Sequence, residues 1–170
     1  MKFLKTPLSL KISLWLVNLF IASLAIVSVI HLFNLYIFLF DWKHMPNEPP
    51  LSRLGIISTS SFSLIVTIFG CISLLIFRKF IRNVKIGQVF TNRNVTLLKR
   101  MPIYLAAYCL LSVITNWLFI HYICEPMEWD PRPVFNSFHG FILTLALLTW
   151  VLAYVFSIGF DMQKERDLTI

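Results

Sequence analysis

The residues of this 170-residue chain that could carry redox or metal chemistry are three cysteines and four histidines. Thiol oxidoreductases need closely paired cysteines to cycle a disulfide, and Cys71, Cys109 and Cys124 form no C-x-x-C pair. His121 and Cys124 have an i, i+3 spacing, but no second pair completes a zinc site. We therefore expect no metal site, no cofactor, no catalytic residue and no enzymatic activity.

A second group of polar residues lies inside long apolar stretches. His31 and Asn34 share one helical face, and Asn116 lies in a later stretch. Such side chains hydrogen-bond between membrane helices or line a pocket or a path for a solute, and the sequence leaves these alternatives open. The same stretches hold no Asp or Glu, which argues against a proton-coupled transporter that depends on a buried acid.

Four uncharged apolar runs must position these residues: 12–40, 54–77, 102–124 and 134–160. Each exceeds the roughly 18 residues that mark a membrane-spanning candidate, and a helix satisfies its own backbone groups in lipid. Hydrophobic residues make up 58% of the chain and charged residues 14%, against roughly 45–50% and about 25% in soluble proteins. The sequence predicts an all-α integral membrane bundle of four transmembrane helices, one domain over residues 1–170, embedded in the lipid bilayer.

The basic residues are distributed unevenly between the two sides of the predicted bundle. Of the fifteen Lys and Arg, three precede the first run, seven lie between the second and third, and two follow the fourth. By the positive-inside rule, both termini and the central connection are expected in the cytoplasm. The net charge of +7 follows from this bias, so we expect no direct binding to nucleic acid.

The connection between the second and third runs has its own helical pattern. Apolar residues at 77, 80, 81 and 84 share a face, and basic residues at 78, 82 and 85 lie on another. Gly87 can end this helix, and Thr91 or Asn92 can cap the next. The pattern predicts that helices two and three extend into the cytoplasm as a hairpin.

Small and hydroxyl residues recur at helical spacing in several runs, which favours close helix packing. In the second run they are Ser60, Ser63, Thr67 and Gly70, and in the fourth they are Gly140, Thr144, Thr149 and Ala153.

Two segments carry a resemblance to a known family. The first fits the pattern G-x-x-F-(S/T)-x-x-N, and the second fits a closing G-x-x-L-Q-x-E-x-D-L-T-I with Met162 in place of its leucine. Both resemble the YoaS-like bacterial membrane family, a domain of unknown function with four predicted spans. The matching residues are Gly87, Phe90, Thr91 and Asn94 in the first segment, and Gly159, Gln163, Glu165, Asp167, Leu168, Thr169 and Ile170 in the second.

The resemblance implies a multi-pass protein of the bacterial inner membrane that is often encoded beside a small helix-turn-helix transcription regulator. Our leading hypothesis is a regulatory membrane protein whose cytoplasmic hairpin and tail dock such a soluble partner. The matching residues, Gly159 apart, are the candidate partner-binding residues. The alternative is a small transporter or channel component, acting alone or as a homo-oligomer, with His31, Asn34 and Asn116 lining its path.

Overall fold

Four long helices make up the fold in the computed structural model, which describes residues 8–40, 50–85, 89–124 and 134–168. They are α1 (Leu8–Phe40), α2 (Pro50–Lys85), α3 (Asn92–Phe119) and α4 (Ser137–Leu168). A π-helical turn, η2 (Ile120–Cys124), continues α3. The all-α prediction is confirmed, and each predicted run overlaps one of the four helices, the third run also including η2.

All four helices are long and apolar enough to cross a membrane, judged by length and composition. The chain is therefore a multi-pass membrane protein by these criteria. The helices also extend beyond the apolar runs. With 36 residues, α2 is roughly 54 Å long at 1.5 Å per residue, whereas the hydrocarbon core of a bilayer is about 30 Å thick. Helix α2 continues past the end of its apolar run to Lys85, and α3 begins ten residues before its apolar run.

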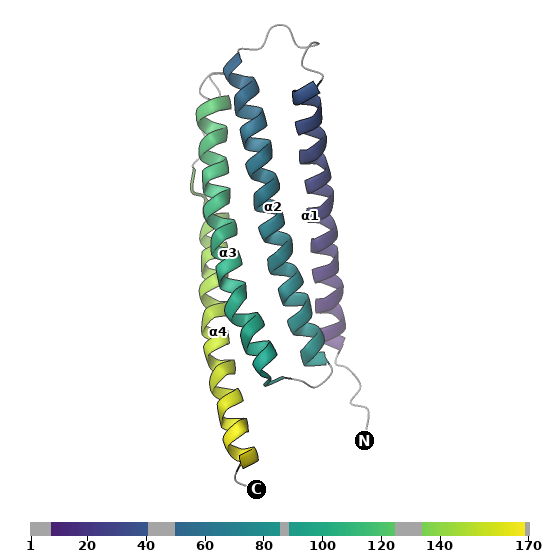
Figure 1. Ribbon diagram of the computed structural model, residues 1–170, viewed down its shortest axis with the longest axis vertical. Coiled ribbons are helices and arrows are strands. Elements are labelled where there is room, and N and C mark those ends of the chain that lie inside the picture. Colours follow the sequence, from purple (N-terminus) through teal and green to yellow (C-terminus); the bar gives the residue numbers. More distant parts are fainter. Residues whose placement is uncertain (1–7, 41–49, 86–88, 125–133, 169–170) are drawn as a thin grey trace.

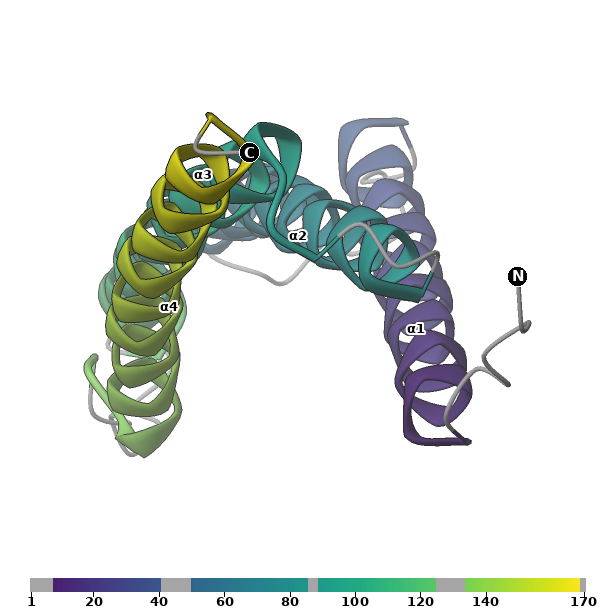
Figure 2. The same ribbon diagram turned by 90° about the horizontal axis from the view of Figure 1, so that it is seen from below.

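The helices stand side by side in chain order and form an open arc (Figures 1 and 2). Among the described residues, α1 packs on α2, α2 on α3, and α3 on α4 and η2, whereas the backbones of α1 and α4 do not approach each other. The arc is consequently open between its first and last helices.

The helix at the first edge of the arc, α1, is apolar on every side, and most of its side chains are exposed. Trp15 and Phe33 are each more than half exposed, as expected for a helix whose surroundings are lipid. The core lies between the other three helices. Its buried members are Met101, Leu105 and Ala146, surrounded by Ile76, Phe77, Ile142 and Leu145.

The small-residue patterns have a mixed outcome. Thr67 and Gly70 on α2, and Thr149 and Ala153 on α4, are buried as predicted. Thr144 is exposed, and a Cβ atom on Gly140 would meet nothing within 4 Å. The prediction is wrong for these last two, because α4 turns that part of its surface away from α3.

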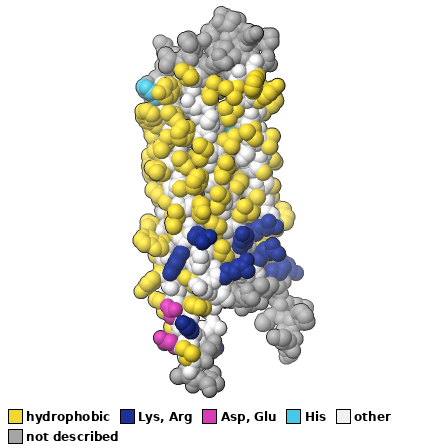
Figure 3. All heavy atoms as spheres, viewed as in Figure 1, with side chains coloured by type: hydrophobic (Ala, Val, Ile, Leu, Met, Phe, Trp, Pro, Cys, Tyr) yellow, Lys and Arg dark blue, Asp and Glu magenta, His cyan; other side chains and the backbone are white. Residues whose placement is uncertain are grey.

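One end of the molecule carries a band of Lys and Arg below a largely apolar surface (Figure 3). We call it the basic end, defined by the end of α2 (Arg78, Lys79, Arg82, Lys85) and the start of α3 (Arg93, Lys99, Arg100). The first turn of α1 and the last turn of α4 lie at the same end, and α4 projects beyond the end of α2 and the start of α3 (Figure 1).

Candidate functional site

Thr91 lies at the basic end and is the N-cap residue of α3. Its backbone is extended, with φ −127° and ψ 149°, and its side-chain oxygen accepts a hydrogen bond from the backbone N–H of Asn94. The N–O distance of this bond is 3.3 Å. A capping hydroxyl satisfies one of the four N–H groups that a helix leaves unpaired at its start. Thr91 therefore fixes where α3 begins.

Asn94 joins α3 to α2 and to the connection between them. Its side chain is fully buried, at 0% exposure. Its Oδ1 accepts from Asn83 Nδ2 at 2.7 Å, and its own Nδ2 donates to the carbonyl of Val89 at 2.9 Å. Both amide functions are thus used inside the fold, so Asn94 positions the connection and is not itself accessible to a partner in this structure.

Phe90 packs against α4 at a glycine. A Cβ atom at Gly159 would lie 2.6 Å from Phe90 Cε1, so the ring occupies the space where a side chain would be. The ring of Phe156 lies 5.3 Å from that of Phe90, and the ring of Phe80 contacts Phe156 edge to face at 5.4 Å. Phe90 nevertheless remains 41% exposed. The ring of Phe90 is therefore covered in part by α4 and accessible in part.

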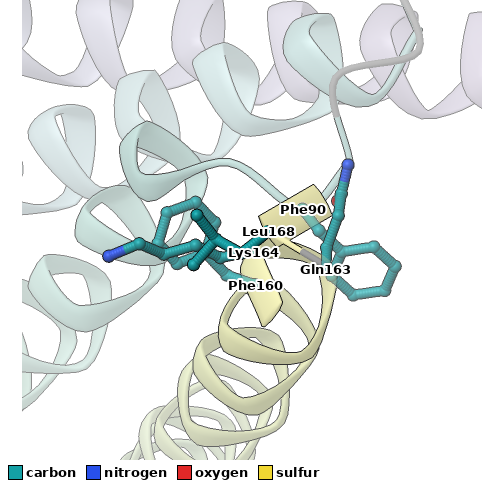
Figure 4. Close-up of a pocket in the computed structure, with 5 residues that line it drawn as sticks. All are labelled: Phe90, Phe160, Gln163, Lys164 and Leu168. Carbon is teal, nitrogen blue, oxygen red and sulfur yellow. The ribbon is translucent and has the colours of Figure 1, made fainter. Parts of the chain in front are cut away.

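A groove of about 250 Å³ lies beside Phe90 and along the end of α4 (Figure 4). Its lining residues are Phe90, Phe160, Gln163, Lys164 and Leu168. The structure thus brings together three of the predicted partner-binding residues: Phe90, Gln163 and Leu168. We call this feature the α4 groove.

The remaining predicted residues have other positions. Glu165 is exposed on α4 but does not line the groove. Gly87, Thr169, Ile170 and the side chain of Asp167 lie outside the described residues. Sequence reasoning missed Phe160 and Lys164. Their i, i+4 spacing with each other and with Leu168 was the available signal, because residues four apart share a helical face.

A second cavity, of about 210 Å³, lies inside the predicted membrane region between α1, α2 and α3. We call it the intramembrane cavity. Of the three predicted intramembrane polar residues, His31 and Asn116 line it and Asn34 does not. The side-chain Nδ2 of Asn116 also donates to the carbonyl of Val134 at 3.3 Å, which ties α3 to the segment before α4.

His139 connects α4 to this cavity, a role that sequence reasoning missed. Only 1% of His139 is exposed. The backbone N–H of Asn136 donates to Nδ1 at 3.1 Å, which leaves the proton of the neutral ring on Nε2. Nε2 lies 3.1 Å from Oγ of Ser112, a cavity residue, and therefore donates to it.

Metal ligands do not gather in any described part of the chain, where no group of three or more His, Cys, Asp or Glu could hold an ion. His121 stacks on Trp117 at a centroid distance of 5.5 Å, and Cys124 is buried. The three cysteines are free thiols.

Comparison with known families gives a match over nearly the whole chain. The family described as "Protein of unknown function (DUF2975)" matches residues 4–170. The chain belongs to this family. Neither a curated protein nor a solved structure matches it.

The match to the DUF2975 family spans both candidate features. All four helices, the α4 groove and the intramembrane cavity lie within the matched residues. The family description assigns no activity, so the function must be argued from the geometry of these two features.

Proposed function

We propose that this protein is a non-enzymatic regulatory membrane protein whose basic end lies in the cytoplasm and docks a small soluble partner at the α4 groove. The band of Lys and Arg supports the orientation, because basic residues are retained on the cytoplasmic side of membranes. In this orientation, the ends of α2 and α3 form the cytoplasmic hairpin, and both termini are cytoplasmic in the bacterial inner membrane.

The observation that carries the docking proposal is the projecting end of α4. Met162 and Leu168 are 64% and 78% exposed there, past the apolar run 134–160 that we assign to the hydrocarbon. Elsewhere the exposed apolar side chains of the helices can be covered by lipid. These two side chains contact water unless another protein covers them. Exposed apolar surface in water is typical of interaction sites.

The chemistry of the groove indicates what it would bind. Phe90, Phe160 and Leu168 supply apolar walls, and Gln163 and Lys164 supply hydrogen-bond donors. A groove of about 250 Å³ is smaller than the roughly 300–1,000 Å³ of typical ligand sites. It suits one or two apolar side chains of a partner protein that also presents an acidic or carbonyl group to Lys164.

The nature of the partner comes from the YoaS-like resemblance. That resemblance implies a neighbouring gene for a small helix-turn-helix transcription regulator, which we propose as the docked protein. Holding such a regulator at the membrane would keep it from its DNA site, so the regulatory role follows from sequestration.

Co-purification tests this function. The full-length protein is extracted from its native membranes in mild detergent, and bound cytosolic proteins are identified by mass spectrometry. Phe90→Ala and Leu168→Ala should each remove the partner. Leu8→Ala is the matched control, because Leu8 is 72% exposed at the same end but does not line the groove. Equal recovery of the same protein from all three variants would contradict docking at the groove.

The intramembrane cavity supports a second candidate function, a small transporter or channel component. His31 and Asn116 from two helices meet at one cavity, as a solute path would require. Reconstituted vesicles loaded with candidate solutes should then show flux that His31→Phe abolishes. Flux that is indifferent to this change would dismiss the cavity as a path.

A further inference from the structure

The intramembrane cavity is lined mainly by uncharged polar side chains from three helices. Its wall depends on Gly70, where a Cβ atom would lie 3.2 Å from both Leu24 Cδ1 and Tyr108 Cε2. The absence of a side chain lets Leu24 of α1 and Tyr108 of α3 both approach the backbone of α2 at Gly70. The lining residues are Leu24, Val27, His31, Ser63, Val66, Thr67, Tyr108, Ser112, Thr115 and Asn116.

Two of the polar residues around the cavity use their hydroxyl protons on their own helix. Thr67 donates to the carbonyl of Ser63 at 2.6 Å, and Thr115 donates to that of Leu111 at 2.8 Å. These hydroxyls can only accept a further hydrogen bond. Hydrogen bonds within a single helix therefore account for only these two of the polar lining residues.

Four other lining side chains keep donors without an acceptor among the described residues: His31, Ser63, Tyr108 and Ser112. Ser112 receives the proton of His139 Nε2, so its own O–H remains to be donated. A donor without a partner in an apolar environment costs roughly 1–3 kcal/mol. The cavity therefore presents four unused hydrogen-bond donors, beside the acceptor oxygens of Thr67 and Thr115.

The occupant of such a cavity is constrained in charge, route and size. No Lys, Arg, Asp or Glu lines the cavity, so a charged group would find no counter-ion. Val27 in the lining is 39% exposed, and α4 does not close the arc on α1 (Figure 2), so entry is from the bilayer. The cavity has a volume of about 210 Å³, whereas pockets for drug-sized ligands have roughly 300–1,000 Å³. It can therefore hold one ring or one head group.

We propose that the intramembrane cavity binds the head of a neutral, lipid-soluble molecule through its carbonyl oxygens, with the tail left in the bilayer. A quinone ring and the ester head of a diacylglycerol share this chemistry. Each offers two carbonyl acceptors to the donors of His31, Ser63, Tyr108 and Ser112, and neither carries a charge. The proposal is independent of partner docking at the basic end.

Native mass spectrometry of the purified full-length protein tests the site with two probes, decylubiquinone and dioleoylglycerol. Tyr108→Phe removes one donor and keeps the ring against Gly70, and His31→Phe removes another. Each should lower retention of the bound probe by about two- to tenfold, the value of one hydrogen bond. Tyr104→Phe is the matched control, because Tyr104 is on the same helix but packs on Phe69 and does not line the cavity.

The outcomes separate cleanly. Retention by the parent and by Tyr104→Phe, with loss in Tyr108→Phe and His31→Phe, supports the site, and the retained probe distinguishes a quinone from a glycerolipid. Retention of neither probe overturns the proposal. Equal retention by all four proteins also overturns it, because the probe would then adhere to the lipid-facing surface. Size-exclusion elution at the parent's volume checks that each variant is folded.

Discussion

The ring of Phe90 fills the space that a side chain at Gly159 would need, since a Cβ atom there would lie 2.6 Å from Cε1 of the ring. This contact joins the connection between α2 and α3 to the last helix. The glycine matters here for close approach: the Cδ1–Cε1 edge of Phe90 can lie this near α4 only where the helix has no side chain.

Substitution of Gly159 by Ala should therefore displace Phe90. We expect a loss of about 1–3 kcal/mol, the usual effect of overpacking, measured by unfolding in detergent. In a Phe90→Ala background, the same change should leave the free energy of unfolding unchanged or raise it by up to about 1 kcal/mol. The reason is that Ala has a higher helix propensity than Gly. An equal loss in both backgrounds would show that the two residues do not interact.

Asn94→Ala should destabilise the protein by about 1–3 kcal/mol, because it leaves the buried amide of Asn83 and the carbonyl of Val89 without partners. Thermal unfolding of the purified protein measures this change. Asn92→Ala is the control: Asn92 is exposed at the start of the same helix, so its loss should fall within about 0.5 kcal/mol. If the two variants unfold alike, the bond between Asn83 and Asn94 adds no stability.

The orientation predicts opposite labelling of two helix starts. In a cysteine-free background, Asn92→Cys at the start of α3 and Ser137→Cys at the start of α4 both expose a thiol. A membrane-impermeant maleimide should label Ser137→Cys in spheroplasts and Asn92→Cys only in inverted vesicles. The reverse pattern would place the basic end outside the cell and remove the docking proposal.

His139 and Ser112 should behave as a coupled pair across α3 and α4. His139→Phe removes the ring nitrogens that contact Asn136 and Ser112, and Ser112→Ala removes the acceptor. Residues in one hydrogen-bond network show coupling energies of about 0.5–3 kcal/mol. A double-mutant cycle on unfolding in detergent measures that energy. Strictly additive losses would mean that the 3.1 Å contact between them makes no net contribution.

The four helices could be predicted from the sequence because each requires only a long uncharged run. Their arrangement could not. α1 is apolar on every side, so its hydropathy pattern does not show which face meets α2, and nothing in the runs themselves distinguishes an open arc from a closed bundle. The helix ends at the basic end were partly predictable, since Thr91 and Asn92 were both candidate caps, and the structure has the cap at Thr91.

The candidate sites divide in the same way. Phe90, Gln163 and Leu168 were found through a resemblance in local sequence, and the structure brings them to one groove. The i, i+4 spacing of Phe160, Lys164 and Leu168 shows that they share a helical face, but tertiary packing sets which face of α4 meets the connection. His139 was missed because a histidine near the end of a run suits the membrane interface equally well, and its burial requires knowing that Asn136 and Ser112 surround it.

The arc of helices has a consequence for how the protein is made. Each helix packs against the helix synthesised just before it, so every main helix interface can form as soon as its second member leaves the insertion machinery, without waiting for the C-terminus. Contacts between sequence neighbours carry a low loop-closure cost and form quickly. An exception is the contact of Phe156 with Phe80 and Phe90. It can form only when α4 arrives, and it therefore completes assembly at the basic end.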